Sequence, residues 1–309
     1  MSLLPNSTVL IDHLQKFYDD LPQWGKFAFA GCIAVVAYVP YRYITTLPRK
    51  TPIKADYKKD VAYLYQFPRF KYVPSMSPFC LKLETWLRMA EVNYENVDCG
   101  WSMRSLEGTL PFIEYNGKEY PDSSFAIRDL TAILSKEGME SHLNDEQHSS
   151  ARAFEVLAEQ SLMRVVDYIR YVENIGEFSK QVPDGTLGNL QPLWLWFAKM
   201  TETLKIVGIG KHNREEIINI GNDDLRAISM YLDSKHYFTG YKPTRVDAAL
   251  FGVLAQIVYA PYEFPQKQLI LNELHNLQDY CDRIRGRYWP DWEECTEKFR
   301  MNSDWKKKV

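Results

Sequence analysis

The chain has 309 residues, of which 46% are hydrophobic and 25% are charged, and its formal net charge is −3. This composition is that of an ordinary globular protein with room for two small domains, and the charge gives no reason to expect nucleic-acid binding. The cysteines form neither a CxxC motif nor a Cys/His cluster, so we expect no metal site and no disulfide framework, which fits a reducing compartment. They are Cys32, Cys80, Cys99, Cys281 and Cys295.

The first predicted element is an uncharged stretch over residues 27–41, flanked by Lys26 and Arg42. A helix over this stretch would span about 22 Å, which is short of the roughly 30 Å hydrocarbon core of a bilayer. Snorkelling of the two flanking cations would close the gap. We therefore predict that residues 1–22 form an N-terminal tail and residues 23–44 a transmembrane anchor. A helix buried in the globular fold is the alternative.

Basic residues predict the orientation of this anchor. They are more frequent after the apolar stretch than before it, which predicts that the C-terminal side faces the cytosol. The expected localisation is a membrane crossed once, with a cytoplasmic protein as the alternative. The sequon Asn6-Ser7-Thr8 falls on the side predicted to lie outside. Residues 45–60, rich in Pro and Lys, are typical of a linker.

A mixed pattern of strands and helices follows over residues 61–138. The apolar run 61–67 predicts a buried strand, and Ser77-Pro78 predicts a helix with Ser77 as its N-cap. Residues 94–97 predict another strand. In the segment 108–124, a proline precedes a strand, an Asn-Gly pair predicts a hairpin, and an Asp-Ser pair begins a helix. This is the thioredoxin-like layout, βαββα.

Residues 145–290 are predicted to be helical throughout. Apolar residues between Phe154 and Val172 recur at i, i+3 and i+4, which predicts one long helix with a buried face. Thr244 and Asp247 resemble a capping box, and we interpret them as a structural cap. Residues 291–309 are predicted to be a tail. The expected fold class is thus α+β: a thioredoxin-like domain, then an all-helical domain, preceded by a hydrophobic N-terminal helix.

Three segments resemble a known family: YLYQFPR (63–69), PSMSPFCLKLETWLRMA (74–90) and YCDRIRGRYWPDW (280–292). They are similar to the failed axon connections family, which takes in the nematode cadmium-responsive proteins and is related to the metaxins. The resemblance covers roughly residues 60–292. The segment 108–124 resembles the second half of the thioredoxin-like domain of glutathione transferases, so N- and C-terminal glutathione S-transferase-like domains are implied.

This resemblance implies a glutathione site. In transferases the acid–Ser pair binds the γ-glutamyl end next to a cis proline, so the candidate glutathione-binding residues are Asp122, Ser123, Leu110 and Pro111. A helix N-terminus lowers the pKa of a thiol. The candidate catalytic residue there is Ser77, with Ser75 and Cys80 as alternatives. Because Ser77 stands where an oxidoreductase has its attacking cysteine, dithiol exchange is not expected. Helix caps, for Ser77 and Asp122, and a core residue, for Cys80, are the plain structural alternatives.

One departure from the transferase pattern concerns the glycine end of glutathione. Only residues 98–110 connect the second strand to Pro111, which leaves little room for the helix whose Lys or Gln grips that end in transferases. Arg104 is the cation that stands in this segment. The loss of one charge-assisted bond costs about 1.5–3 kcal/mol. We therefore expect weak or absent catalysis.

The resemblance implies two functions of different class. One is a membrane-anchored glutathione S-transferase-like protein that binds glutathione, in detoxification or in the response to stress and cadmium. The other is a non-catalytic interaction protein in axon development or membrane-associated trafficking. Expected partners are a membrane, glutathione, and a protein partner or second copy of the chain. The basic residues at 283, 285, 287 and 306–308 would either contact anionic lipid or form a solvated helix face.

Overall fold

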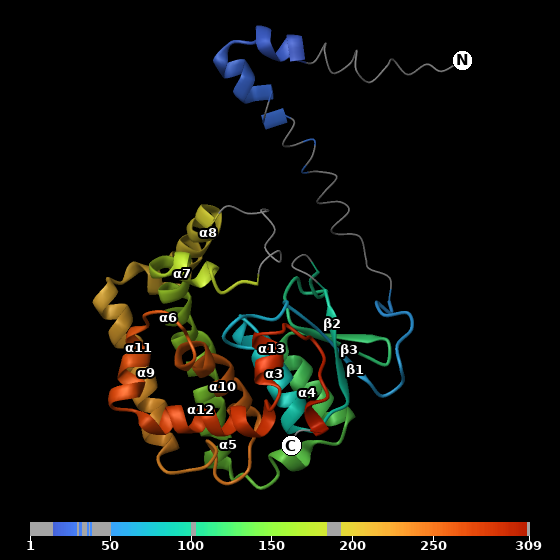
Figure 1. Ribbon diagram of the computed structural model, residues 1–309, viewed down its shortest axis with the longest axis vertical. Helices are drawn as coiled ribbons and strands as arrows, with labels where there is room; N and C mark the ends of the chain where they lie inside the picture. The colour runs from blue at the N-terminus through green and yellow to red at the C-terminus, as the bar shows by residue number, and fades with distance from the viewer. Residues whose placement is uncertain are drawn as a thin grey trace. The chain divides into compact units, whose positions relative to one another are not determined.

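The computed structural model describes residues 15–29, 31–32, 36, 38, 51–99, 103–183 and 193–307 (Figure 1). The chain divides into two compact units, residues 1–53 and 54–309. In the first unit, residues 15–20 and 23–29 are helical. Within the described ranges, no helix has the length and apolarity needed to cross a membrane. Much of the predicted anchor 23–44, and the whole sequon at Asn6, lie outside these ranges.

The second unit begins with a four-stranded mixed sheet, as a thioredoxin-like domain requires. Its strands are β1 (Ala62–Gln66), β2 (Tyr94–Asp98), β3 (Phe112–Tyr115) and β4 (Lys118–Pro121), in the order β2-β1-β3-β4. β1 is parallel to β2 and antiparallel to β3, which is antiparallel to β4. Helices α3 (Pro78–Met89) and α4 (Ser123–Ile133) complete the domain. The predicted order βαββα contains three strands, whereas the structure has four, because the hairpin contributes both β3 and β4.

The predicted hairpin connects β3 to β4. Asn116 and Gly117 both have positive φ, 49° and 78°, as a two-residue type I′ turn requires. The pairing of Tyr115 with Lys118 closes the turn, and the pairing of Phe112 with Pro121 sets the register at the other end. The local sequence therefore fixes the ends of both strands.

Helices form the rest of the second unit. They are α5 (Asp145–Val156), α6 (Met163–Tyr168), α7 (Ile175–Ser179), α8 (Leu193–Ile206), α9 (Arg214–Leu232), α10 (Arg245–Val258), α11 (Pro265–Asn272), α12 (His275–Tyr288) and α13 (Trp292–Thr296). Short 3₁₀ turns lie at Glu137–Met139, Ile209–Lys211 and Trp305–Lys307. The long helix predicted around 154–172 is present as a continuous helical run. Two π-helical segments, Leu157–Leu162 and Ile169–Glu173, interrupt it.

Helix α10 packs directly against the start of α3 and joins the two domains. A Cβ atom at Gly252 would lie 2.6 Å from the carbonyl oxygen of Pro78, so only glycine permits this close approach. Thr244 begins α10, and its N–H donates to Asp247 Oδ2 at 2.7 Å. The other carboxylate oxygen of Asp247 accepts from the Tyr280 hydroxyl at 2.9 Å. The cap therefore also binds α10 to α12.

Residues 291–307 are not the tail that the sequence analysis expects. They form α13 and a final 3₁₀ turn, and Trp292 and Trp305 are buried. Asn302 pairs with the backbone of β2: its Oδ1 accepts from the Asn96 N–H at 2.6 Å, and its Nδ2 donates to the Asn96 carbonyl at 2.8 Å. The segment is thus part of the folded unit.

A buried charge cluster holds this segment against α3 and the sheet. Glu84 is fully buried and accepts from both terminal nitrogens of Arg69, at 2.7 and 2.8 Å. Arg88 donates to both carboxylate oxygens of Asp291, at 2.5 and 3.0 Å, and Arg69 also donates to the Met301 carbonyl. Burial alone would raise the pKa of Glu84, but the neighbouring Arg69 outweighs it and lowers that pKa to about 2. Glu84 is therefore an ionised, fully paired carboxylate.

Candidate functional site

Hydroxyl groups at the start of α3 are engaged in capping the helix. Ser77 is the N-cap, and its Oγ accepts from the Cys80 N–H at 3.4 Å. The Ser77 N–H in turn donates to Ser75 Oγ at 3.3 Å, and Ser75 is fully buried. Ser77 keeps partial exposure. Of the two hydroxyls, Ser77 is thus the one that a ligand can reach.

Cys80 lies in the core beneath this cap. Its side chain is fully buried, and burial raises the pKa of the thiol to about 11. A thiol with this pKa is protonated near neutral pH, and the thiolate is the nucleophilic form. Cys80 therefore has the properties of a core residue rather than of a nucleophile.

Asp122 and Ser123 form the start of α4. Asp122 Oδ1 accepts from the N–H groups of Ser124 and Phe125, at 2.7 and 3.0 Å. Asp122 has φ 62° and ψ 139°, a conformation that costs a non-glycine residue free energy and that concentrates at functional sites. Phe112, the residue after Pro111, pairs with Pro121, the residue before Asp122, and the Leu110-Pro111 peptide bond is cis. The structure thus brings the sequence-predicted pair and the predicted proline to the same end of the β3–β4 pairing.

A pocket of about 470 Å³ lies where these residues face the helical domain. Asp122, Ser123 and Phe79 line it from the thioredoxin-like domain, while Glu155 and Glu159 line it from the helical domain. The N-terminus of α4 gives it a partial positive charge on one wall. The other wall carries Glu155 and Glu159 together with Arg152 and Arg245, and Arg128 lies on the α4 side. The pocket thus offers complementary contacts to a ligand that has both an ammonium and a carboxylate.

Arg104 is not brought into this pocket. Its guanidinium lies 5.5 Å from the centre of the Phe67 ring, and it donates to the Met103 carbonyl at 2.6 Å. Leu110 and Pro111 are buried and are also not among the side chains that line the pocket. Of the predicted glutathione-binding residues, Asp122 and Ser123 therefore line the pocket, whereas Leu110, Pro111 and Arg104 do not.

Lys82 is a site residue that sequence reasoning missed. Its buried ammonium donates to Ser124 Oγ at 2.8 Å, to Glu155 at 2.8 Å and to Glu159 at 2.5 Å. A signal was present, because Glu155 and Glu159 lie four residues apart on the same helical face as the buried Leu162. Charged residues on a buried face need a partner.

The two carboxyls that share Lys82 differ in their pKa. Burial tends to raise the pKa of both. At Glu155 the ammonium of Lys82 and the guanidinium of Arg245 outweigh burial, and the pKa is lowered. At Glu159 burial prevails, with the negative charge of Glu155 adding to it, and the pKa is raised. Glu159 is therefore the carboxyl that accepts a proton more readily.

Arg170, in the second π-helical segment, supports the loop before α3. The guanidinium is fully buried and donates to the Met76 carbonyl at 2.8 Å, to Gln256 Oε1 at 2.6 Å and to the Tyr72 hydroxyl at 3.1 Å. These bonds connect the helical domain to the residue before Ser77. Among the residues that the structure describes, no three His, Cys, Asp or Glu side chains form a group able to hold a metal ion.

Family models for glutathione S-transferases match two parts of the chain. The N-terminal domain model matches residues 78–176, and the C-terminal domain model matches residues 221–284. Both the acid–Ser pair and the two carboxylates at Lys82 fall within the first match. The Thr244 cap falls within the second.

Several characterised proteins are similar in sequence. Failed axon connections of Drosophila melanogaster is 36% identical over 81% of this chain, which spans 63% of that protein, less than two thirds of its length. Isoprene-epoxide–glutathione S-transferase of a Rhodococcus strain is 26% identical over 70% of this chain and 94% of its own. Metaxin-1 of Bos taurus is 27% identical over 72% of this chain and 73% of its own.

Solved structures agree with these matches at the level of the fold. A glutathione S-transferase of Ceriporiopsis subvermispora, crystallised with glutathione, superposes with a TM-score of 0.52 at 15% identity and covers 74% of this chain and 97% of its own. A glutathione transferase of Phanerochaete chrysosporium gives the same TM-score at 12% identity, covering 74% and 98%.

Proposed function

Because this chain belongs to the glutathione S-transferase-like proteins related to Failed axon connections and the metaxins, we propose that it binds glutathione with weak or absent transferase activity. The observation that carries the proposal is the strained Asp122, which with Ser123 begins α4 at the wall of a pocket. The Rhodococcus relative is by name a glutathione S-transferase, which supports the same ligand.

The charges of the pocket fit the γ-glutamyl end of glutathione. That end carries one carboxylate and one ammonium. The Ser123 hydroxyl would hold the carboxylate at the positive end of the α4 dipole, which favours an anion. Asp122 would keep this helix start in place, because its Oδ1 already accepts from the N–H groups of Ser124 and Phe125. Glu159 would face the ammonium from the helical domain. Lys82 positions Glu159 and keeps the like charges of the two glutamates from repelling each other.

Catalysis would rest on Ser77 alone. A hydroxyl that accepts a hydrogen bond still has its own proton to donate, so Ser77 could stabilise a glutathione thiolate at the start of α3. Cys80 is buried and protonated near neutral pH, so it adds no nucleophile. Arg104 does not line the pocket, so it is not placed to clamp the glycine end. We expect conjugation of a model electrophile such as 1-chloro-2,4-dinitrobenzene at or near the background rate.

Titration calorimetry of glutathione into the full chain tests the binding site. We expect a Kd in the millimolar range or tighter, which corresponds to about −4 kcal/mol or better. Asp122→Ala should abolish the heat. The matched control is Asn144→Ala, because Asn144 caps α5 through the Gln147 N–H and its loss removes a cap outside the pocket. Absence of heat up to ~10 mM glutathione, or equal loss in both variants, would overturn the proposal.

A non-catalytic interaction protein is the second candidate. The closed start of α3, with its hydroxyls engaged in the cap and its thiol buried, favours this candidate over turnover. In this second candidate function, the chain would bind a protein partner or a second copy of itself. Glutathione binding without conjugation of the model electrophile would support a binding role, whereas conjugation that Ser77→Ala abolishes would exclude it.

Membrane association through residues 23–44 belongs to the proposal as well. Trp24, Phe27 and Val36 support it, because their side chains are 75%, 78% and 70% exposed in the first unit. Flotation of the full chain with phosphatidylcholine vesicles tests this idea. We expect it to float, and a Phe27→Asp, Val36→Asp variant to stay in solution. A native chain that does not float would favour the cytoplasmic alternative. A part in the response to cadmium stays a prediction of the resemblance.

A further inference from the structure

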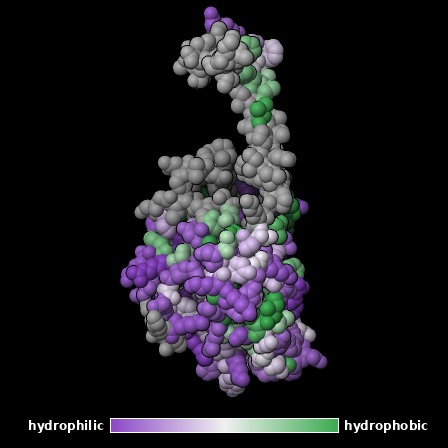
Figure 2. All heavy atoms as spheres, turned by 90° about the vertical axis from the view of Figure 1, so that its right-hand side faces the viewer, coloured by the Kyte–Doolittle hydropathy of each residue, from purple (hydrophilic) through white to green (hydrophobic). Residues whose placement is uncertain are grey.

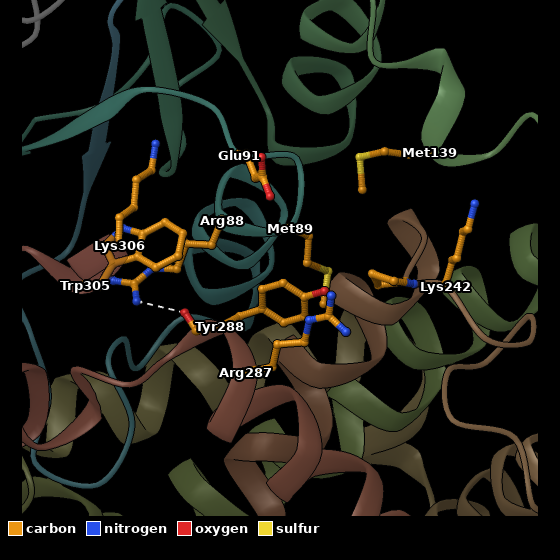
Figure 3. Close-up of a pocket in the computed structure, with 10 residues that line it drawn as sticks. Arg88, Met89, Glu91, Met139, Lys242, Arg287, Tyr288, Trp305 and Lys306 are labelled. Atoms are coloured by element: carbon orange, nitrogen blue, oxygen red, sulfur yellow. Dashed lines mark hydrogen bonds between the residues drawn. The ribbon is translucent and has the colours of Figure 1, made fainter. Parts of the chain in front are cut away.

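A second cavity, of about 710 Å³, lies at the C-terminal end of α3. None of its lining residues lines the pocket at Asp122. Figure 3 places Trp305 and Lys306 on one side of it and Lys242 on the other, with Glu91 and Arg287 between them. The walls therefore come from five separate parts of the chain: the end of α3, the 3₁₀ turn that ends at Met139, the loop before α10, the end of α12 and the segment after α13.

Three of the side chains around this cavity are cations without an acidic partner. Lys242, Arg287 and Lys306 are exposed, and none forms an ion pair with a carboxylate among the described residues. Glu91 is the single carboxylate that lines the cavity. Arg88 adds no free charge, because Asp291 and Glu84 neutralise it. The rim therefore carries an excess of positive charge on a chain whose net charge is −3.

The side of the cavity that carries Trp305 is aromatic and is held by several contacts. The Arg88 guanidinium lies 5.0 Å from the centre of the Trp305 ring, and Lys306 Nζ lies 5.8 Å from the same ring. Arg88 also donates to the Tyr288 carbonyl at 2.9 Å, the bond drawn in Figure 3. The charge cluster thus fixes the indole and the end of α12 before any ligand arrives, which lowers the entropic cost of binding.

We propose that this cavity binds a phosphate-bearing organic anion, with Lys242, Arg287 and Lys306 as its cationic contacts. The volume lies within the range of small-molecule sites, roughly 300–1,000 Å³. The guanidinium fork suits phosphate oxygens, and ammonium groups add charge without demanding one geometry. Several cations around one cavity fit a ligand with several negative charges, and the Trp305 indole provides a surface for its organic part.

Calorimetric titration of inositol hexakisphosphate into the full chain tests this site. The variant is Lys242→Ala, Arg287→Ala, and the matched control is Lys199→Ala, Lys211→Ala, which removes two positive charges from exposed lysines elsewhere. We expect the first variant to weaken binding by roughly tenfold or more, since each contact is charge-assisted. The control should stay within about twofold of the native chain, and binding should weaken as salt is added.

Two outcomes would overturn the site: no binding by the native chain at millimolar ligand, or equal weakening in both variants. Unchanged thermal midpoints of the two variants show that each has folded. The glutathione site is tested separately, with the Asp122→Ala variant. A chain that does not bind glutathione can therefore still bind inositol hexakisphosphate, and a chain that does not bind inositol hexakisphosphate can still bind glutathione.

A second arm identifies the source of the phosphate. The same titration is repeated in the presence of phosphatidylcholine vesicles, with and without phosphatidylinositol 4,5-bisphosphate. Competition only by the vesicles that contain the phosphoinositide assigns a lipid headgroup to the cavity. Binding that neither kind of vesicle affects assigns a soluble organic phosphate. Both results support the cavity as a phosphate site.

Discussion

The two ends of α3 use different chemistry. At its N-terminal end, Ser75 and Ser77 form neutral hydrogen bonds over a buried thiol, and Gly252 packs against the first turn. At its C-terminal end, Glu84 and Arg88 belong to a buried charge cluster that reaches the last residues of the chain. The N-terminal end is where a glutathione transferase activates its thiol. Helix α3 is thus anchored at its C-terminal end by charges that lie outside any thiol chemistry at its N-terminal end.

The largest effect is expected from breaking the charged end. Glu84→Gln leaves Arg69 and Arg88 buried with one carboxylate fewer, and such a loss costs about 3–5 kcal/mol. Chemical denaturation measures the change in the free energy of unfolding. Glu91→Gln, an exposed carboxylate just beyond the same end of α3, should change it by less than about 0.5 kcal/mol. A cost below ~1 kcal/mol for Glu84→Gln would show that the cluster is not what anchors this end.

Acid should weaken the same end. The folded-state pKa of Glu84 is about 2, below its ordinary value of 4.5, because the neighbouring cations outweigh burial. This lowered pKa contributes about 3 kcal/mol to the free energy of unfolding. The contribution is complete above pH 4.5, and it is lost as the pH falls through the folded-state pKa of about 2. Unfolding curves collected between roughly pH 5 and pH 2 measure this loss. As the pH falls, the free energy of unfolding should decrease less for Glu84→Gln than for the native chain.

The neutral end can be tested through its packing. Gly252→Ala forces a methyl group to within 2.6 Å of the Pro78 carbonyl, so α10 must move, and we expect a loss of about 1–3 kcal/mol. Gly286→Ala is the control, since a Cβ atom there meets nothing within 4 Å. A helical glycine in open space gains roughly 0.5–1 kcal/mol on substitution by alanine. Opposite signs of the two changes in thermal denaturation would confirm that α10 contacts the start of α3 closely.

The smallest effect is expected at the cap itself. Ser77→Ala removes one N-cap bond and should cost about 1 kcal/mol, as helix caps typically do. If Ser77 only caps α3, glutathione affinity measured by calorimetry should stay unchanged. A different result would be that Ser77→Ala lowers the glutathione affinity or the conjugation rate by more than the lost cap explains. That result would show that Ser77 contacts the ligand directly.

Local features of the fold could be predicted from the sequence. Asn116-Gly117 specifies its turn through positive φ angles, and Ser77-Pro78 specifies the start of α3, because both depend on neighbouring residues alone. The acid–Ser pair could be placed at a helix start for the same reason. Hydrophobic periodicity predicts the helical domain, and the order of strand, turn and helix-start signals predicts the thioredoxin-like domain.

Long-range pairs could not be predicted in this way. Arg88 and Asp291 lie 203 positions apart, and nothing near either residue in the sequence indicates the other. For the same reason the sequence of 291–307 predicts a tail, since the burial of this segment depends on partners in α3 and the sheet. The cavity between Lys242 and Lys306 escaped notice likewise, because the fold alone brings these residues around one space.

The Asn302 side chain covers part of an exposed sheet edge, which matters for self-association at high protein concentration. β2 is the outermost strand on its side of the sheet, and the outer N–H and C=O groups of such a strand are a template on which another chain can add a strand. The Asn302 side chain occupies both groups of Asn96 in the middle of that strand. A single amide thus interrupts the template at the β2 edge, where it leaves no free backbone pair at the middle of the strand for another chain.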